Sequence, residues 1–166
     1  MTRAVNRSRN AMTLDTLERR ILSIYQRDTR IAADEIGARV GLSAAAVQRH
    51  IKRMRENGVI TAETATLKRR KLGLGVTAIV HVDLVDESAR SIQAFRDKIA
   101  VRDDVQQCYG VTGTADYALI VVVTDLAAYD ALCNACLLHD TNVRSFTTHI
   151  VLDELKRTGI VDIPLD

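Results

Sequence analysis

Residues 30–60 constrain this chain more than any other stretch. They read RIAADEIGARVGLSAAAVQRHIKRMRENGVI, in which two short helical patterns are joined by Gly41-Leu42-Ser43. The second pattern carries cations on one face and ends at Asn57-Gly58, where glycine adopts the left-handed conformation that terminates helices. Two helices joined by so tight a turn indicate a helix-turn-helix, a motif that offers its second helix to the major groove of DNA.

The second helix of this motif has two chemically different sides. Ser43 is expected to cap its N-terminus, where backbone N–H groups can also bind a phosphate. At about 100° per residue, one side is apolar and holds Ala44, Val47, Ile51 and Met54. The opposite side, with Gln48 at its border, holds the residues expected to meet DNA: Ala45, Arg49, Lys52 and Arg53. An ordinary solvated helix can carry such cations, but the turn, the Gly58 stop and a basic segment downstream together favour DNA contact.

Charge is unevenly divided along the chain. Residues 1–75 hold 16 Lys/Arg and 7 Asp/Glu, whereas residues 76–166 hold 7 and 14, which together make the chain's 23 and 21. A basic half beside an acidic half predicts two domains, of which the basic one faces a polyanion. Within the basic half, Lys68, Arg69 and Arg70 are expected to meet backbone phosphates rather than bases.

After Gly75 the pattern changes to alternating strands and helices. Strands are expected at 76–85, 105–111, 117–123 and 143–152, and helices at 86–100 and 125–137. This β-α-β-β-α-β order is the ferredoxin-like split unit, a four-stranded antiparallel sheet with both helices on one face. The other sheet face needs a cover, and a second copy of the chain is the simplest one.

The sequence thus predicts an α+β protein of two domains. A winged helix-turn-helix domain precedes a ferredoxin-like βαββαβ domain. The expected segments are a disordered basic arm (1–12), the DNA-binding domain (13–61), the wing and linker (62–75) and the second domain (76–166). Thr13 is expected to be the first N-cap, and a β-wing is expected over Thr61–Leu67.

Gly110-Val111-Thr112-Gly113-Thr114-Ala115-Asp116-Tyr117 is the second informative motif. Two glycines around a strand-to-strand turn leave backbone N–H groups uncovered beside a carboxylate and a phenol. Such a cleft suits a zwitterion, whose carboxylate meets the N–H groups while Asp116 takes the ammonium. A hairpin turn that merely needs glycine, with Asp116 as a turn former, explains the same residues.

No catalytic or metal cluster is expected. Cys133 and Cys136 lie in a predicted helix with no second pair of ligands, so they are interpreted as core residues, and Cys108 completes no disulfide framework. The histidines lack the spacing of a metal or catalytic site. We therefore expect no cofactor. The absence of a long apolar run and of a signal-peptide core predicts a cytoplasmic protein without membrane contact.

With both motifs considered, the chain from Leu14 to Leu165 resembles the Lrp/AsnC family of feast/famine transcriptional regulators. The resemblance is carried by Leu14-Asp15 with Ile21-Leu22, Asp34-Glu35-Ile36, Val40-Gly41-Leu42-Ser43, Gly58-Val59-Ile60, Leu72-Gly73, Val105 with Cys108-Tyr109, Val111-Thr112-Gly113 with Asp116-Tyr117, and Ile150-Val151-Leu152 with Leu155-Lys156. It implies double-stranded DNA as a partner, a homodimer assembling to a tetramer or octamer, and an amino-acid effector bound near the Gly113–Tyr117 turn. The effector residues that it implies are Tyr109, Val111, Gly113, Thr114, Ala115, Asp116, Tyr117 and Thr148.

Three departures from the family pattern stand out. His50 occupies a position in the second helix of the motif where the family usually has arginine, which alters local DNA contact. Lys68-Arg69 replaces a frequent Asp-Pro pair and makes the connector unusually basic. Phe146 and Thr148 stand where two threonines are common, so Phe146 points to a more apolar ligand or to none.

The principal hypothesis is a non-enzymatic, sequence-specific transcriptional regulator that responds to an amino acid. Proteins resembling this family also decarboxylate sirohaem, a role that His81 or His149 would carry here, but that activity leaves the basic face without a purpose. A nucleoid-type protein that binds DNA without sequence choice or effector is the third alternative.

Overall fold

A computed structural model describes residues 14–165; Thr13 and the arm at 1–12 lie outside the described residues. The described chain divides into two compact units. One unit contains residues 14–65 together with 157–165, and the other contains residues 66–156. No helix among the described residues is both long enough and apolar enough to cross a membrane.

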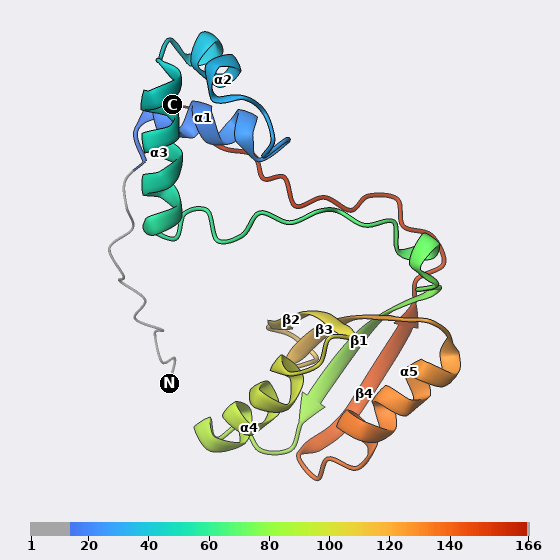
Figure 1. Cartoon of the computed structure of the whole chain (residues 1–166). Helices are drawn as coiled ribbons and strands as arrows, with labels where there is room; N and C mark the ends of the chain where they lie inside the picture. The colour runs from blue at the N-terminus through green and yellow to red at the C-terminus, as the bar shows by residue number, and fades with distance from the viewer. Residues whose placement is uncertain (1–13, 166) are drawn as a thin grey trace. The chain divides into compact units, whose positions relative to one another are not determined.

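The first unit is built from three helices, α1 (Thr16–Tyr25), α2 (Ala33–Val40) and α3 (Ala44–Glu56) (Figure 1). Helix α1 begins after Asp15, whose side chain accepts a hydrogen bond from the backbone of Glu18 at 2.7 Å. Glu18 reaches back to the Asp15 backbone and completes a capping box, so Asp15 is the N-cap where Thr13 was expected. The helices enclose an apolar core whose fully buried members are Ile21, Ile36, Val47 and Met54.

The predicted turn between α2 and α3 is present. Gly41 has a φ of 78°, and the backbone N–H groups of Gly41 and Leu42 both donate to the carbonyl of Gly37, at 2.8 and 3.0 Å. Ser43 then caps α3 by accepting a hydrogen bond from the backbone of Ala46. Gly58, with a φ of 70°, follows the end of α3 in the left-handed conformation that was expected.

The segment after α3 does not form the expected β-wing. Residues 61–68 have no regular secondary structure and lead to a short 3-10 helix, Arg69–Leu72. Glu63 fixes the start of this segment because its carboxylate accepts hydrogen bonds from Tyr25 at 2.7 Å and Arg55 at 2.8 Å. Both hydrogen bonds lower the pKa of Glu63, and the one from Tyr25 has the larger effect. Hydrogen bonding to α1 and α3 thus holds the chain where a strand was predicted.

The C-terminal residues belong to the helical unit and not, as the expected boundary placed them, to the second domain. The Gln26 side chain donates to the carbonyl of Val161 at 2.9 Å and accepts from its N–H at 3.0 Å. Arg19 donates to the carbonyl of Pro164 at 3.1 Å, and Ile163 packs against the core of the three helices. Two separate segments of the chain, 14–65 and 157–165, therefore form the helical unit.

Removing residues 157–166 is expected to destabilise the helical unit by about 2 kcal/mol, since hydrogen bonds are worth about 1 kcal/mol each and the cover over the core is lost. Amide hydrogen exchange of α1 in the full and shortened chains measures this loss. Amides of the second unit serve as the internal control and should exchange alike in both. Unchanged protection of α1 would contradict the role given to this tail.

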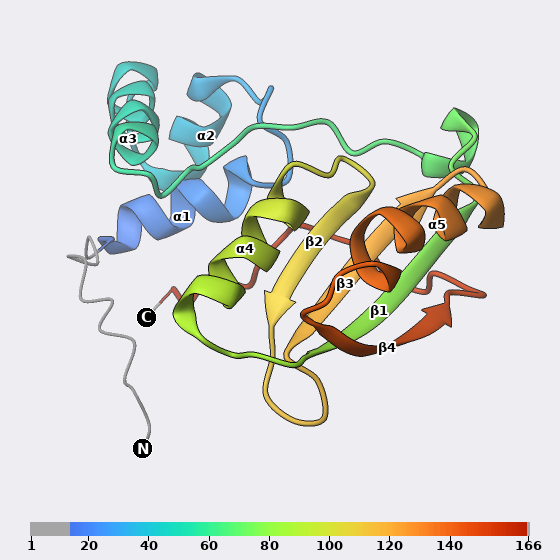
Figure 2. The same ribbon diagram turned by 90° about the horizontal axis from the view of Figure 1, so that it is seen from below.

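The second unit is the expected four-stranded antiparallel sheet, with the strand order β2-β3-β1-β4. Helices α4 and α5 cover one of its faces (Figure 2). The elements along the chain are β1 (Val76–Leu84), α4 (Ala89–Ala100), β2 (Val105–Gly110), β3 (Tyr117–Val123), α5 (Leu126–Cys133) continued by a π-helical turn (Asn134–Leu138), and β4 (Val143–Ile150).

Alternation along β1 separates the two faces of this sheet. Ala78, Val80 and Val82 are completely buried beneath the helices, together with Leu119 and Val121 of β3. Cys133 and Cys136 join this core, as predicted. The intervening residues point to the open face: Thr77, Ile79, His81 and Asp83 on β1, Ala118 and Ile120 on β3, and Ser145, Thr147 and His149 on β4. Within residues 66–156, the face predicted to need a cover is therefore free of helices.

Candidate DNA-binding surface and effector pocket

Helix α3 presents the side that the sequence predicted. Val47, Ile51 and Met54 are buried against the other helices, whereas the opposite side is exposed. The exposed residues are Ser43, Ala45, Gln48, Arg49, Lys52 and Arg53. Their common exposure on one capped helix provides a surface of the kind that enters a major groove.

Gln48 and Arg49 are the members of this surface with the most available hydrogen-bonding groups. Within residues 14–165, neither side chain has a hydrogen bond or ion pair to the protein. Lys52 lies 3.8 Å from Glu56, but both side chains are well exposed, so the pair is weak and readily exchanged for a phosphate. A free guanidinium suits guanine and a free amide suits adenine.

Arg53 is committed to the protein in a way that the helical pattern did not reveal. Its guanidinium makes two hydrogen bonds to the Oε1 atom of Glu18 on α1, one of them from Nε at 3.0 Å, and these raise the pKa of Arg53. The Glu18 side chain is only 1% exposed, whereas that of Arg53 is 48% exposed. Arg53 therefore neutralises a buried carboxylate and fixes α3 on α1, and only part of its guanidinium remains for DNA.

His50 faces the same carboxylate and not the exposed side of α3. Its Nδ1 atom lies 3.6 Å from Oε1 of Glu18, too far for a hydrogen bond, and its side chain is 18% exposed. Asp15, Glu18 and His50 bring potential metal-ligand atoms within 4.8 Å of one another, but Arg53 already occupies Glu18. His50, which stands where the family usually has arginine, therefore faces Glu18 and not the exposed side of α3. Its effect on DNA contact is indirect.

The basic connector is divided between exposed and engaged cations. Lys68 and Arg70 are exposed, as a phosphate contact requires. The Arg69 side chain is largely covered and lies 3.5 Å from Glu154, so it also serves the structure of the second unit.

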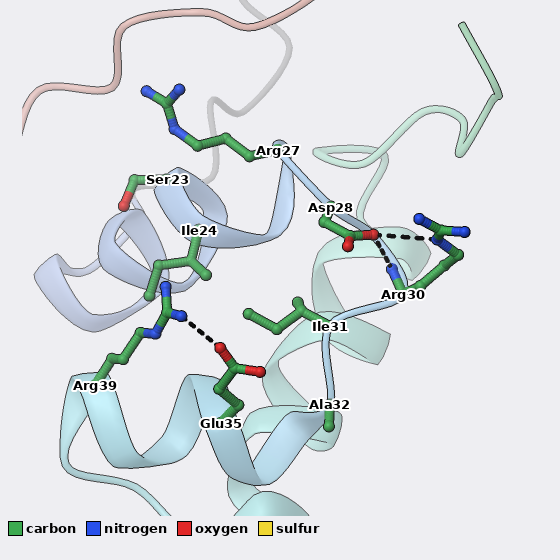
Figure 3. Close-up of a pocket in the computed structure, with 9 residues that line it drawn as sticks. All are labelled: Ser23, Ile24, Arg27, Asp28, Arg30, Ile31, Ala32, Glu35 and Arg39. Atoms are coloured by element: carbon green, nitrogen blue, oxygen red, sulfur yellow. Dashed lines mark hydrogen bonds and ion pairs between the residues drawn. The ribbon is translucent and has the colours of Figure 1, made fainter.

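A cavity of about 740 Å³ lies between α1 and α2 in the helical unit (Figure 3). Arg39 pairs with Glu35, and Arg30 pairs with Asp28 at 3.3 Å, so two of its three arginines are neutralised internally. A backbone hydrogen bond from Arg30 lowers the pKa of Asp28, which keeps that pair ionised. Figure 3 shows one pair on α2 and the other in the segment between α1 and α2, with Arg27 pointing away from both. This largely compensated charge gives the cavity no clear preference for an anionic ligand.

The loop at 110–117 in the second unit is held by the carboxylate that was expected to bind an ammonium. Oδ2 of Asp116 accepts a hydrogen bond from the backbone of Leu84 at 2.7 Å, and the Asp116 N–H donates to Val82 at 2.9 Å. Gly113 has a φ of 123°, a conformation that side-chain-bearing residues rarely adopt. Asp116 therefore anchors the loop to β1 and has one oxygen already used.

The other expected effector residues do not share one surface. Tyr117 is buried against Phe95, with 4.8 Å between ring centroids, and its hydroxyl accepts from Arg96 at 3.2 Å. Thr148 faces the helices and is hydrogen-bonded to Tyr129, whose pKa burial raises to about 12. Phe146 also packs into the helix-covered core and does not line a ligand site. Tyr109, Val111 and Gly113 are exposed.

Thr114 and Ala115 do line a cavity, of about 290 Å³, on the open face of the sheet. The remaining lining residues come from β1 and β4, and sequence reasoning did not assign them to the effector: His81, Asp83, Ser145, Thr147 and His149. Hydroxyl, imidazole and carboxylate groups thus converge beside the 110–117 loop. In the sequence, only the alternation of side chains along β1 and β4 indicates that these five residues share a face, since every second residue of a strand points to the same side of the sheet.

Comparison with known proteins agrees with this architecture. Residues 77–161 match the family described as the Lrp/AsnC ligand binding domain, and residues 14–61 match winged helix-turn-helix DNA-binding domains. The chain belongs to the Lrp/AsnC family. It is accordingly a DNA-binding transcriptional regulator of the Lrp/AsnC type, with the predicted two-domain α+β fold.

Individual Lrp/AsnC relatives resemble the chain over nearly its whole length. An HTH-type transcriptional regulator of Sinorhizobium fredii is 34% identical over 155 residues, which cover 93% of this chain and 92% of the relative. The crystal structure of an AsnC family regulator from Agrobacterium tumefaciens is 31% identical, with a TM-score of 0.83 and coverage of 90% and 97%. A regulator from Neisseria meningitidis, solved as a complex with L-Met, is 27% identical, with the same TM-score and coverage.

Proposed function

We propose that this Lrp/AsnC protein reads DNA sequence through α3 and that a small amino acid alters its DNA binding. The observation that supports the first part most strongly is that Gln48 and Arg49 are exposed and have no partner among residues 14–165, on a helix whose other side is buried. Donors that the protein does not satisfy itself are available to base edges. Lys68 and Arg70 would add contacts to phosphates, which strengthen binding without selecting a sequence.

Replacing Arg49 with alanine is expected to weaken binding to a duplex selected by the protein about tenfold to a hundredfold, the cost of one base contact. Random duplexes should be affected far less. Arg70→Ala is the matched control, because losing a phosphate contact should weaken binding to selected and random duplexes alike. Gel-shift titrations on both duplexes measure the two ratios. Equal losses for both variants on both duplexes would contradict the assignment of Arg49 to base recognition.

The dimer is proposed to form through the open face of the sheet. Ile79 and Ile120 lie on the face of the sheet opposite to α4 and α5, the two α-helices of this unit among the described residues. Covering them with a second copy removes apolar surface from water and, through the two-fold axis, presents two α3 helices to DNA. Further assembly to a tetramer or octamer belongs to the same proposal, and sedimentation equilibrium tests it.

The cavity beside Thr114 and Ala115 is the proposed effector site. Its Asp83 carboxylate suits the ammonium of an amino acid, which would compete with the exposed Arg144 guanidinium 3.4 Å away. The hydroxyls of Ser145 and Thr147 suit the carboxylate of the amino acid. A volume of about 290 Å³ is at the lower end for organic ligands, which favours an amino acid over a tetrapyrrole such as sirohaem. The complex of the Neisseria meningitidis regulator with L-Met supports this class of effector.

Asp83→Asn is expected to weaken amino-acid binding about tenfold or more, because it removes a charge-assisted hydrogen bond. A thermal-shift screen of the standard amino acids on the wild-type chain identifies the ligand, and calorimetry then compares the variants. Asp97→Asn, an equivalent change at an exposed position of α4, is the control. The site is refuted if Asp83→Asn binds the identified amino acid as tightly as the wild type does.

A further inference from the structure

Two histidines meet on the open face of the sheet without a role in DNA reading. His81 lies on β1 and His149 on β4, which are neighbouring antiparallel strands (Figure 2). His81 is opposite Thr147 and His149 is opposite Ile79, so the imidazoles are diagonal neighbours on one face. Their ring centroids are 5.6 Å apart, and the ring planes are inclined by 80°.

We propose that His81 and His149 together bind one divalent transition-metal ion of the zinc, nickel and copper group. An imidazole nitrogen binds such an ion at about 2.0–2.1 Å, which places the ring centre about 3.2 Å from the metal. Two rings on one ion, at an angle between tetrahedral and trigonal, then have centres about 5.2–5.5 Å apart. The observed 5.6 Å lies just above this range, so a small rotation of the side chains is enough to bring both rings onto one ion.

Both rings line the cavity of about 290 Å³. Thr147 also lines it, and Asp83, whose carboxylate lies 3.4 Å from Arg144, can accept from the outer N–H group of a ligating ring. Asp83 lies two residues from His81 on the same strand and shares the open face with it. Imidazole ligands select zinc, copper and nickel, whereas magnesium and calcium prefer oxygen alone.

This site lies in the cavity of the proposed effector site, and a zinc titration made without DNA or amino acids lets the two proposals fail separately. No spacing in the sequence indicated it, since its two ligands come from the first and last strands of the sheet. Strand pairing alone brings them together.

Calorimetric titration of the full chain with ZnCl2, without DNA or amino acids, tests the proposal. One ion per chain is expected, with about tenfold or greater weakening in each of His81→Gln and His149→Gln. His139→Gln and Cys108→Ser, at an exposed histidine and an exposed thiol elsewhere in the unit, should bind zinc as the wild type does.

Imidazole proton–nitrogen correlation spectra of the wild-type chain provide a measurement that needs no variant. Zinc should shift the resonances of His81 and His149 and leave those of His139 in place. Unshifted His81 and His149, a histidine variant that binds zinc as tightly as the wild type, or loss of binding in Cys108→Ser would each overturn the site. A stoichiometry of half an ion per chain would also overturn it, by placing the ion between two copies.

Discussion

Gly37→Ala is expected to destabilise the DNA-binding unit by about 2–3 kcal/mol, although alanine is the better helix former by about 1 kcal/mol. A Cβ atom at this position would lie 2.3 Å from the carbonyl oxygen of Leu42, closer than any real contact. That oxygen belongs to the turn, and the Gly37 carbonyl already accepts the N–H groups of Gly41 and Leu42. Because hydrogen bonds join residue 37 to the turn, neither segment can move away without the other. The turn must therefore open, and α3 must shift.

Thermal unfolding followed by circular dichroism measures the stability loss, and a gel shift measures the accompanying loss of DNA binding. Gly159→Ala makes the same chemical change where a Cβ meets nothing within 4 Å, and it should change neither property. A Gly37→Ala chain as stable as the wild type would show that α2 does not pack against the turn in this way.

Glu18→Ala is expected to cost about 3 kcal/mol of stability in the same unit. The change removes a charge-assisted bond to Arg53, worth about 1.5–3 kcal/mol, together with half of the capping box of α1. Arg53→Ala should also destabilise the unit, because it leaves the buried Glu18 carboxylate without its guanidinium. If Arg53 contacted only DNA, Arg53→Ala would leave the stability of the free protein unchanged.

Glu35→Ala is the control for this prediction. Glu35 also pairs with an arginine, Arg39, but both side chains are more than half exposed, so the expected loss is below about 1 kcal/mol. Denaturant unfolding of the three variants ranks them. Equal effects of Glu18→Ala and Glu35→Ala would mean that the Glu18–Arg53 contact does not hold α3 in place.

Much of the fold could be predicted because its signals are local. Ser43 and Gly58 delimit α3 through capping chemistry, and the apolar spacing from Val47 to Met54 identifies its buried side. Strand β3 was predicted with its observed bounds, because a short apolar run between turn residues is typical of a buried strand.

What the sequence could not reveal depends on contacts between distant residues. A helical pattern places Arg53 with Arg49 on one face, but only the packing of α1 shows that Arg53 is bound by Glu18. The tail is similar, because Val161 and Gln26 are hydrogen-bonded although 135 positions separate them in the sequence.

The effector residues show the same limit within one motif. Thr114 and Tyr117 are close in sequence, yet Thr114 lines the cavity on the open face and Tyr117 is buried under the helices. Thr114 lies in the loop before β3, whereas Tyr117 is the first residue of that strand and points to its helix-covered side, so this motif does not form one side of a site. The partners of Thr114 instead come from β1 and β4, which only the strand register brings near.

Equilibrium binding across a salt series tests most directly whether the exposed side of α3 binds duplex DNA. Fluorescence anisotropy of a labelled duplex, selected by the wild-type chain from a random pool, is followed at increasing ionic strength. We expect tight binding at low salt, a linear fall of log affinity with log salt from released counterions, and a marked preference over a scrambled duplex that Arg49→Ala removes. Absence of binding at any salt concentration, or a preference that survives in Arg49→Ala, would contradict DNA binding by this side of α3.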